Sequence, residues 1–153
     1  MGRHADAVKL SIAASSVRQW YGSMVLGRLR VPPGALTLFD ADGARAAAVA
    51  ARLGCRAAVT LAEAARCEVC VTMLPTGAIV TEVLTAAQDA AFLGHAAPGT
   101  VVVDMSSSEP LGTQATGRTL AARGLTLIDA PVSGGVARAV DATLAIMIGA
   151  DDE

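Results

Sequence analysis

The sequence Leu125-Thr-Leu-Ile-Asp129-Ala-Pro-Val-Ser-Gly-Gly135 joins a short apolar run to a turn of small residues. The apolar run is typical of a buried strand, which Asp-Ala-Pro ends. The Ser-Gly-Gly that follows places a hydroxyl and two unshielded backbone amides just beyond that strand. Because glycine has no Cβ, a ligand can approach this backbone closely, and free amides bind anions such as carboxylates. The stretch therefore predicts a buried sheet with an anion-binding turn at a strand end.

Apolar runs alternate with alanine-rich helical patterns along the whole chain, as in βαβ units of a parallel sheet. We expect strands near Val8–Ala14, Leu36–Asp40, Ala57–Thr60, Val69–Leu74, Thr100–Met105, Thr126–Ala130 and Leu144–Ile148. We expect helices near Gly22–Val31, Ala44–Leu53, Leu61–Arg66, Ala78–Phe92 and Pro110–Arg123. The continuous apolar run Val101-Val-Val103 predicts burial on both faces of its strand. The predicted fold class is α/β, a Rossmann-like, doubly wound and mostly parallel sheet.

Helix-end signals support these boundaries. Thr60-Leu-Ala-Glu63 has the spacing of a capping box, and Thr76 can cap the next helix. Gly54 and Gly124 fall just past helix ends, where a left-handed residue is favoured. Ser108, two residues before Pro110, is expected to cap the last of these helices.

Composition limits the class of protein. The 153 residues are enough for one domain with a core, which we place at residues 8–153 after a tail at residues 1–7. The net charge of −2 argues against nucleic acid as a partner, and the apolar runs are shorter than the roughly 18 residues of a membrane span. The N-terminus does not resemble a signal peptide, so we expect a cytoplasmic protein. A hydrophobic content of 53% fits a sheet covered on both faces, or a domain that has lost a partner.

Cys67-Glu-Val-Cys70 has the spacing of a redox motif. We assign both cysteines to one strand, where residues three apart point to opposite faces. They are therefore interpreted as buried core residues rather than as a dithiol or a metal site.

The predicted strand ends bring polar and small residues to one edge of the sheet. In doubly wound folds the ligand binds beyond the carboxyl ends of the strands. That edge would carry Asp40, Leu74-Pro75, Ser106–Ser108 and Ser133–Gly135. Asp40 can accept both ribose hydroxyls of an adenosine and would repel a 2′-phosphate; the alternative is a simple turn aspartate. Ala41 follows it and no arginine is adjacent, so NAD is favoured over NADP.

Ser133 does not fit a nucleophile. The Gly-x-Ser-x-Gly turn is absent, and the only histidines are His4 in the tail and His95 in an expected loop. Two histidines so placed also argue against a metal site.

Four segments in this order resemble the β-hydroxyacid dehydrogenase family, which includes 3-hydroxyisobutyrate dehydrogenase and the cofactor domain of 6-phosphogluconate dehydrogenase. They are Val71-Thr-Met-Leu-Pro75, Val101–Pro110, Asp129–Gly135 and Ala142–Gly149. The resemblance runs from about Met24 to the C-terminus.

The resemblance implies roles for these residues. Leu74 and Pro75 would pack against the cofactor, and Ser107 would approach the nicotinamide ribose. Ser133, Gly134 and Gly135 would bind a small hydroxy-acid substrate. Family enzymes have a second, all-helical domain that helps them oligomerise, and we expect this chain to lack it and to self-associate. Family members often have glycine where this chain has Ala142.

The first strand should lead into a glycine-rich phosphate loop, but no glycine occurs between Val8 and Tyr21. Codons for Ala14–Trp20, read one base earlier, permit the family-like Gly-Phe-Ile-Gly-x-Ala-Met. We therefore hypothesise a compensated frameshift across roughly Ser11–Tyr21; an ordinary divergent loop is the alternative.

The family's catalytic base is also not found. It is a lysine of the helical domain, whereas the single lysine here is Lys9, which we place at the opposite edge of the sheet. The leading hypothesis is the cofactor domain of an NAD-preferring 3-hydroxyacid dehydrogenase, truncated and inactive alone. Alternatives are a non-catalytic, vestigial nucleotide-binding protein and the cofactor domain of an imine reductase relative.

Overall fold

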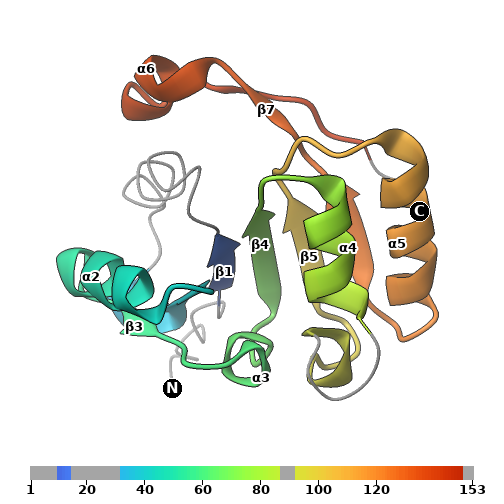
Figure 1. Ribbon diagram of the computed structural model, residues 1–153, viewed down its shortest axis with the longest axis horizontal. Coiled ribbons are helices and arrows are strands. Elements are labelled where there is room, and N and C mark those ends of the chain that lie inside the picture. Colours follow the sequence, from blue (N-terminus) through green and yellow to red (C-terminus); the bar gives the residue numbers. More distant parts are fainter. Residues whose placement is uncertain (1–9, 15–31, 87–91, 150–153) are drawn as a thin grey trace, which may run out of the picture.

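The computed structural model describes residues 10–14, 32–86 and 92–149. Within these ranges, six parallel strands form one sheet in the order β3-β2-β1-β4-β5-β6 (Figure 1). They are β1 Leu10–Ala14, β2 Leu36–Asp40, β3 Arg56–Ala57, β4 Val69–Met73, β5 Val101–Asp104 and β6 Thr126–Asp129. This is the strand order of a Rossmann fold, with its topological switch between β1 and β4. The predicted doubly wound α/β fold is therefore confirmed.

Helices connect the strands. They are α2 Gly43–Leu53, α3 Leu61–Ala64, α4 Gly77–Thr85, α5 Pro110–Ala121 and α6 Gly135–Val140, with short 3₁₀ turns at Pro33–Ala35 and Phe92–Gly94. The helix expected near Gly22–Val31 lies outside the described residues. None of the helices in the described ranges is both long and apolar enough to cross a bilayer.

Most of the predicted helix ends are confirmed. Thr60 and Thr76 accept backbone N–H bonds from residues three positions further on, at 3.2 and 3.3 Å. Gly54 and Gly124 adopt left-handed φ angles of 67° and 76°. The predicted cap Ser108 was wrong by one residue, because the carboxylate of Glu109 accepts the first-turn N–H of α5 at 2.8 Å.

One face of the sheet carries the larger core cluster. The helices α4 and α5 lie side by side over this face, joined by a 2.8 Å hydrogen bond between Thr81 and Thr116 (Figure 1). Leu84, Val102 and Leu120 of this cluster are fully buried. Burial of such apolar side chains is the main stabilising term of the fold.

The opposite face of β5 is less covered than the sequence suggests. Val102 is buried, but Val101 and Val103 are only half-buried. The run Val101–Val103 is therefore not buried equally on both faces, and that prediction was wrong for its alternate residues.

Two of the predicted boundaries shift by several residues. Val59 and Thr60 lie between β3 and α3 rather than in a strand, and α4 ends at Thr85. The expected continuation of α4 toward Phe92 crosses residues 87–91, which are not described.

The C-terminal part forms a separate hairpin. β7 Val132–Ser133 pairs antiparallel with β8 Ala145–Ile146, which is shorter than the strand predicted near Leu144–Ile148. The helix α6 between them was not predicted, and it projects beyond the carboxyl edge of the main sheet (Figure 1). Ala142, in the turn after α6, has a φ of 56°, a conformation that glycine adopts at lower cost, which fits the glycine expected there from the resemblance.

The arrangement of Cys67 and Cys70 differs from the prediction. β4 begins at Val69, so Cys67 precedes the strand, and the two side chains are hydrogen-bonded to each other instead of facing apart. That bond and complete burial raise the pKa of the Cys70 thiol well above its usual value. Both cysteines belong to the core cluster, as expected, and the three cysteines, all in the described ranges, form no disulfide.

Candidate dinucleotide site

The carboxyl ends of the strands meet along one edge. Parallel register places Ala14 of β1 level with Asp40 of β2 and with Met73 of β4. Along β4 and β5, Thr72 lies level with Asp104. Asp40, the Leu74–Pro75 turn and the Ser106–Ser108 turn therefore share this edge on both sides of the switch point. The predicted convergence of these three segments is confirmed.

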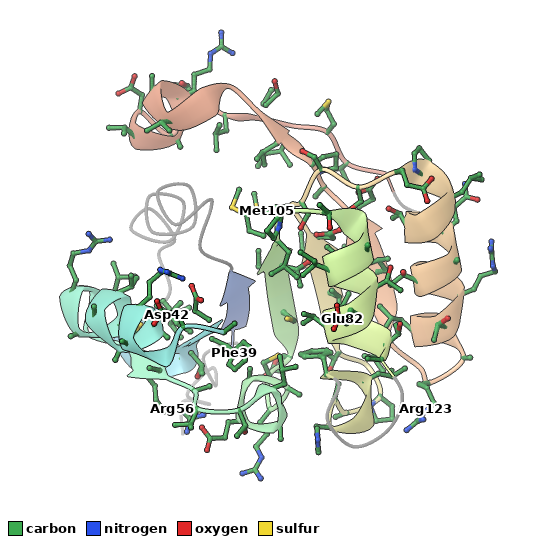
Figure 2. All side chains as sticks on the ribbon, in the orientation of Figure 1. Phe39, Asp42, Arg56, Glu82, Met105 and Arg123 are labelled. Carbon is green, nitrogen blue, oxygen red and sulfur yellow. The ribbon has the colours of Figure 1, made fainter. Side chains whose placement is uncertain are left out.

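Asp40 ends β2 in a charged cluster. Its Oδ1 accepts the backbone N–H of Asp42 at 2.8 Å and lies 3.1 Å from Nη1 of Arg45. Nη2 of Arg45 lies 2.9 Å from Asp42. Figure 2 shows Asp42 at the start of α2. The expectation that no arginine stands beside Asp40 was wrong, because the first turn of α2 brings Arg45 back over the strand end.

Asp104 ends β5 in a very different environment. Its side chain is buried, in a residue only 1% exposed. Oδ1 accepts hydrogen bonds from the Thr72 hydroxyl at 2.8 Å and from the Ser106 backbone at 3.0 Å. Oδ2 accepts the Ser108 hydroxyl at 3.2 Å. Three neutral donors from two strand ends thus converge on one buried carboxylate.

The same network joins the two loops that follow β4 and β5. The backbone N–H of Leu74 donates to the Ser106 hydroxyl at 2.9 Å. Gly77 at the start of α4 packs so closely on Ser108 that an added Cβ would lie 3.0 Å from the Ser108 Cβ. Ser106 and Ser108 therefore hold the loops together, and Ser107 between them is exposed.

The Leu74 side chain is not a surface for a cofactor. It is 4% exposed and belongs to the core cluster. What the turn offers a ligand is the Leu74 backbone and the half-buried Pro75.

The Ser133–Gly135 segment follows β7 rather than a strand of the main sheet. Gly134 and Gly135 have φ angles of 137° and 69°, which side-chain-bearing residues rarely adopt. An added Cβ on Gly134 would lie 2.6 Å from the Arg138 side chain. The backbone conformation and the close packing of Arg138 therefore account for glycine here, a reason separate from the predicted close approach of a ligand.

Asp129 connects this segment to the network. It ends β6 level with Asp104, and partial burial, together with the negative charge of Asp104, raises the pKa of its carboxyl group. Its backbone also bridges to Gly149. A groove of about 740 Å³ runs along α5 and β6 past Asp129, on the outer side of the sheet rather than over the switch point.

Sequence reasoning missed two residues of this edge. Arg45 is three residues after Asp42, a spacing that permits an ion pair on a helix. Asp104 ends an apolar run in the way that Asp40 does, and this parallel was available from the sequence. Within the described ranges, no three His, Cys, Asp or Glu residues are grouped as metal ligands would be.

The strand order, the switch point and the acidic end of β2 define a dinucleotide-binding domain. A family profile described as the NAD binding domain of 6-phosphogluconate dehydrogenase matches residues 22–153. The chain belongs to the β-hydroxyacid dehydrogenase family, as its nicotinamide-dinucleotide-binding domain, which confirms the resemblance of the four segments.

Relatives agree with this assignment. The chain is 37% identical over 123 residues to an NAD-dependent L-serine dehydrogenase of Pseudomonas aeruginosa, covering 77% of this chain and 39% of that protein. It is 36% identical over 132 residues to an uncharacterised oxidoreductase of Mycobacterium tuberculosis, covering 86% and 44%. A solved structure of Mycobacterium tuberculosis 3-hydroxyisobutyrate dehydrogenase with L-serine has a TM-score of 0.74 and 32% identity, covering 93% and 47%. The chain thus spans less than half the length of these relatives.

Proposed function

We propose that this chain is the cofactor domain of an NAD-preferring 3-hydroxyacid dehydrogenase of the 3-hydroxyisobutyrate type. The enzyme would reversibly oxidise a small 3-hydroxy acid to its semialdehyde, with the bound nicotinamide as hydride acceptor. The single observation that carries the proposal is the placement of Asp40 at the carboxyl end of β2, beside the switch point. A carboxylate there fits the ribose hydroxyls of an adenosine.

The residues at the carboxyl edge of the sheet fit both the adenosine half and the nicotinamide half of a dinucleotide. Among the described residues one donor reaches Oδ2 of Asp40, Arg45 Nη1 at 3.3 Å, so this oxygen retains capacity for a ribose hydroxyl. Leu74 and Pro75 would line the cofactor through the turn, and Ser107 would hydrogen-bond near the nicotinamide ribose. The hypothesised frameshift segment Ser11–Tyr21 lies mostly outside the described residues, and the family match begins at Gly22.

Ser133, Gly134 and Gly135 are proposed to bind the substrate. Two of the relatives' names point to L-serine, which is itself a 3-hydroxy acid, so 3-hydroxyisobutyrate and L-serine are the substrates to test first. The Ser133 hydroxyl would donate to the substrate, and the glycine backbone would accommodate its carboxylate.

Proton transfer requires a general base, and the described residues of this site include no lysine. By family resemblance it is a lysine of the helical domain, and Lys9 is expected at the opposite edge. Loss of a positioned general base costs about 10²–10⁴-fold in rate. The chain by itself is therefore expected to show no measurable turnover.

The test is NADH production from 3-hydroxyisobutyrate and from L-serine, measured for four proteins. These are the unaltered chain, a variant with a glycine loop in place of Ser11–Tyr21, a fusion to the helical domain of a relative, and the variant with both changes. Only the doubly changed protein should turn over, because the loop places the nicotinamide and the lysine moves the proton. Robust turnover by the unaltered chain would contradict the proposal.

The domain is also expected to self-associate. Apolar side chains are exposed on α6 and at the C-terminal hairpin: Val136, Val140, Ile146, Met147 and Ile148. The most exposed of them is Ile148, at 74%, and exposed apolar side chains that gather on a surface favour association. Light scattering should show concentration-dependent oligomers, and Ile146→Ser with Ile148→Ser should reduce them; a monodisperse wild-type monomer at high concentration would refute this.

A further inference from the structure

The carboxyl end of β2, where the ribose is proposed to bind, has a cationic side chain beside it that the sequence pattern did not indicate. The guanidinium of Arg45 bridges two carboxylates, with Nη1 at 3.1 Å from Asp40 and Nη2 at 2.9 Å from Asp42. The Asp40 side chain is 8% exposed, that of Arg45 21% and that of Asp42 47%. The bridge therefore runs from the buried strand end to the solvent.

Local backbone structure fixes this bridge. Asp42 caps α2 by accepting the Arg45 backbone N–H at 3.2 Å, and its own N–H donates to Asp40 at 2.8 Å. These bonds set the turn between β2 and α2. As a result, Arg45 in the first turn of α2 lies over Asp40 instead of extending away from it.

The net charge of the subsite is consequently smaller than that of its two carboxylates alone. Asp40 and Asp42 contribute −2 and Arg45 contributes +1, so the cluster carries −1. A 2′-phosphate would meet a guanidinium as well as carboxylates. Guanidinium groups have five N–H donors in a planar fork and bind phosphate bidentately.

We propose that Arg45 is the specificity-determining residue of this subsite, and that it permits binding of a 2′-phosphorylated dinucleotide. The proposal rests on the proposed cofactor function. In it, Arg45 remains paired with the buried Asp40 and releases the exposed Asp42, since exposed ion pairs are weak. The freed N–H groups then bind the 2′-phosphate. Asp42 acts as the competitor that restrains Arg45, so the two residues have opposite effects on NADPH.

The experiment is calorimetric titration of the whole chain with NADH and NADPH, up to millimolar concentrations. Arg45→Ala should weaken NADPH by about 10-fold or more, the effect of losing a charge-assisted hydrogen bond, and NADH by less than about threefold. Arg45→Lys should keep part of the NADPH affinity, because it keeps the charge. The matched control is Arg52→Ala in the last turn of the same helix, which should change neither affinity.

A gain of binding gives the sharper test, since a damaged fold cannot produce it. Asp42→Asn keeps a good helix cap while removing one carboxylate from Arg45. It should tighten NADPH about threefold to 10-fold with little change for NADH, a shift of the size expected for a released charge-assisted bond. The double variant Asp42→Asn with Arg45→Ala should lose this gain.

The outcomes separate this inference from the proposed function. If the wild-type chain binds neither dinucleotide, the proposed function fails and the inference fails with it. If NADH binds but Arg45→Ala leaves the ratio of the two affinities unchanged, only the inference is overturned. Equal losses for both dinucleotides would likewise overturn it, because they would show that Arg45 only supports the fold.

Discussion

The acidic ends of β2 and β5 occupy equivalent places in the sheet but are stabilised in different ways. Asp40 is paired with Arg45 and reaches toward solvent through Asp42. Asp104 is buried among hydroxyl and amide donors from its own and the neighbouring strand. A carboxylate whose charge is balanced at the surface can discriminate between ligands by charge. A carboxylate enclosed by neutral donors instead fixes the geometry of the loops around it.

The largest expected effect is the loss of stability when Asp104 is substituted. Asp104→Ala would leave the Thr72 hydroxyl and the Ser106 N–H buried without their acceptor, at a cost of about 2–5 kcal/mol in the free energy of unfolding. Asp104→Asn keeps an acceptor oxygen and should cost distinctly less. Urea denaturation of both variants measures the difference.

The control for this stability prediction is Asp40→Ala. It removes an ion pair that is buried at Asp40 and open to solvent at Arg45, together with the acceptor of the Asp42 N–H, and should cost less, about 1–2 kcal/mol. If Asp40→Ala destabilised the chain as much as Asp104→Ala, the distinction between the two strand ends would be wrong.

The second effect is a change in cofactor preference when Asp40 is substituted. If the chain binds dinucleotides, NADH should bind more tightly than NADPH. Asp40→Ala should reduce the ratio of the NADPH to the NADH dissociation constant by about 10-fold, because a charge-assisted bond to the ribose is lost. Asp104→Asn should instead weaken both dinucleotides alike, through the Leu74 and Ser107 loops. The measurement is the pair of dissociation constants for each variant; equal or tighter binding of NADPH by the wild type would refute the role of Asp40.

The strand pattern and the edge of the sheet were predictable from sequence because apolar runs and helix caps are local signals. Asp40, Leu74 and Ser107 each directly end or follow such a run, so parallel topology alone brings them together. Arg45 and the Asp104 network were not predicted, since they depend on which side chains meet across a turn or between strands. The helix α6 was missed because its six residues, Gly135–Val140, are too short to show a period.

A smaller effect concerns backbone strain, which neither strand end carries. Ala142 adopts a left-handed φ of 56°, unfavourable for any residue with a Cβ. Ala142→Gly should raise the free energy of unfolding by about 0.5–1 kcal/mol, as relief of strain exceeds the entropy added to the unfolded chain. Ala115→Gly, inside α5, is the matched control and should lower it by about 1 kcal/mol. A destabilising Ala142→Gly would show that the turn is not strained in solution.

The smallest effect tests whether the negative charge of Asp104 raises the pKa of the neighbouring Asp129. Burial and the Asp104 charge raise the pKa of Asp129, so folding favours its protonated form. The stability from this group is fully present below the ordinary carboxyl pKa of about 3.9 and is lost as the pH rises through the folded value. Asp129→Asn should therefore stabilise the chain at neutral pH relative to wild type, and this difference should vanish in acid.

Titration of the Asp129 carboxyl by NMR should show its pKa falling in Asp104→Asn and unchanged in Asp40→Asn, because Asp40 lies across the sheet and Arg45 balances its charge. If the pKa of Asp129 fell by a similar amount in both variants, Asp40 would affect it as strongly as Asp104 does. The proposed difference between the two carboxylates would then be wrong.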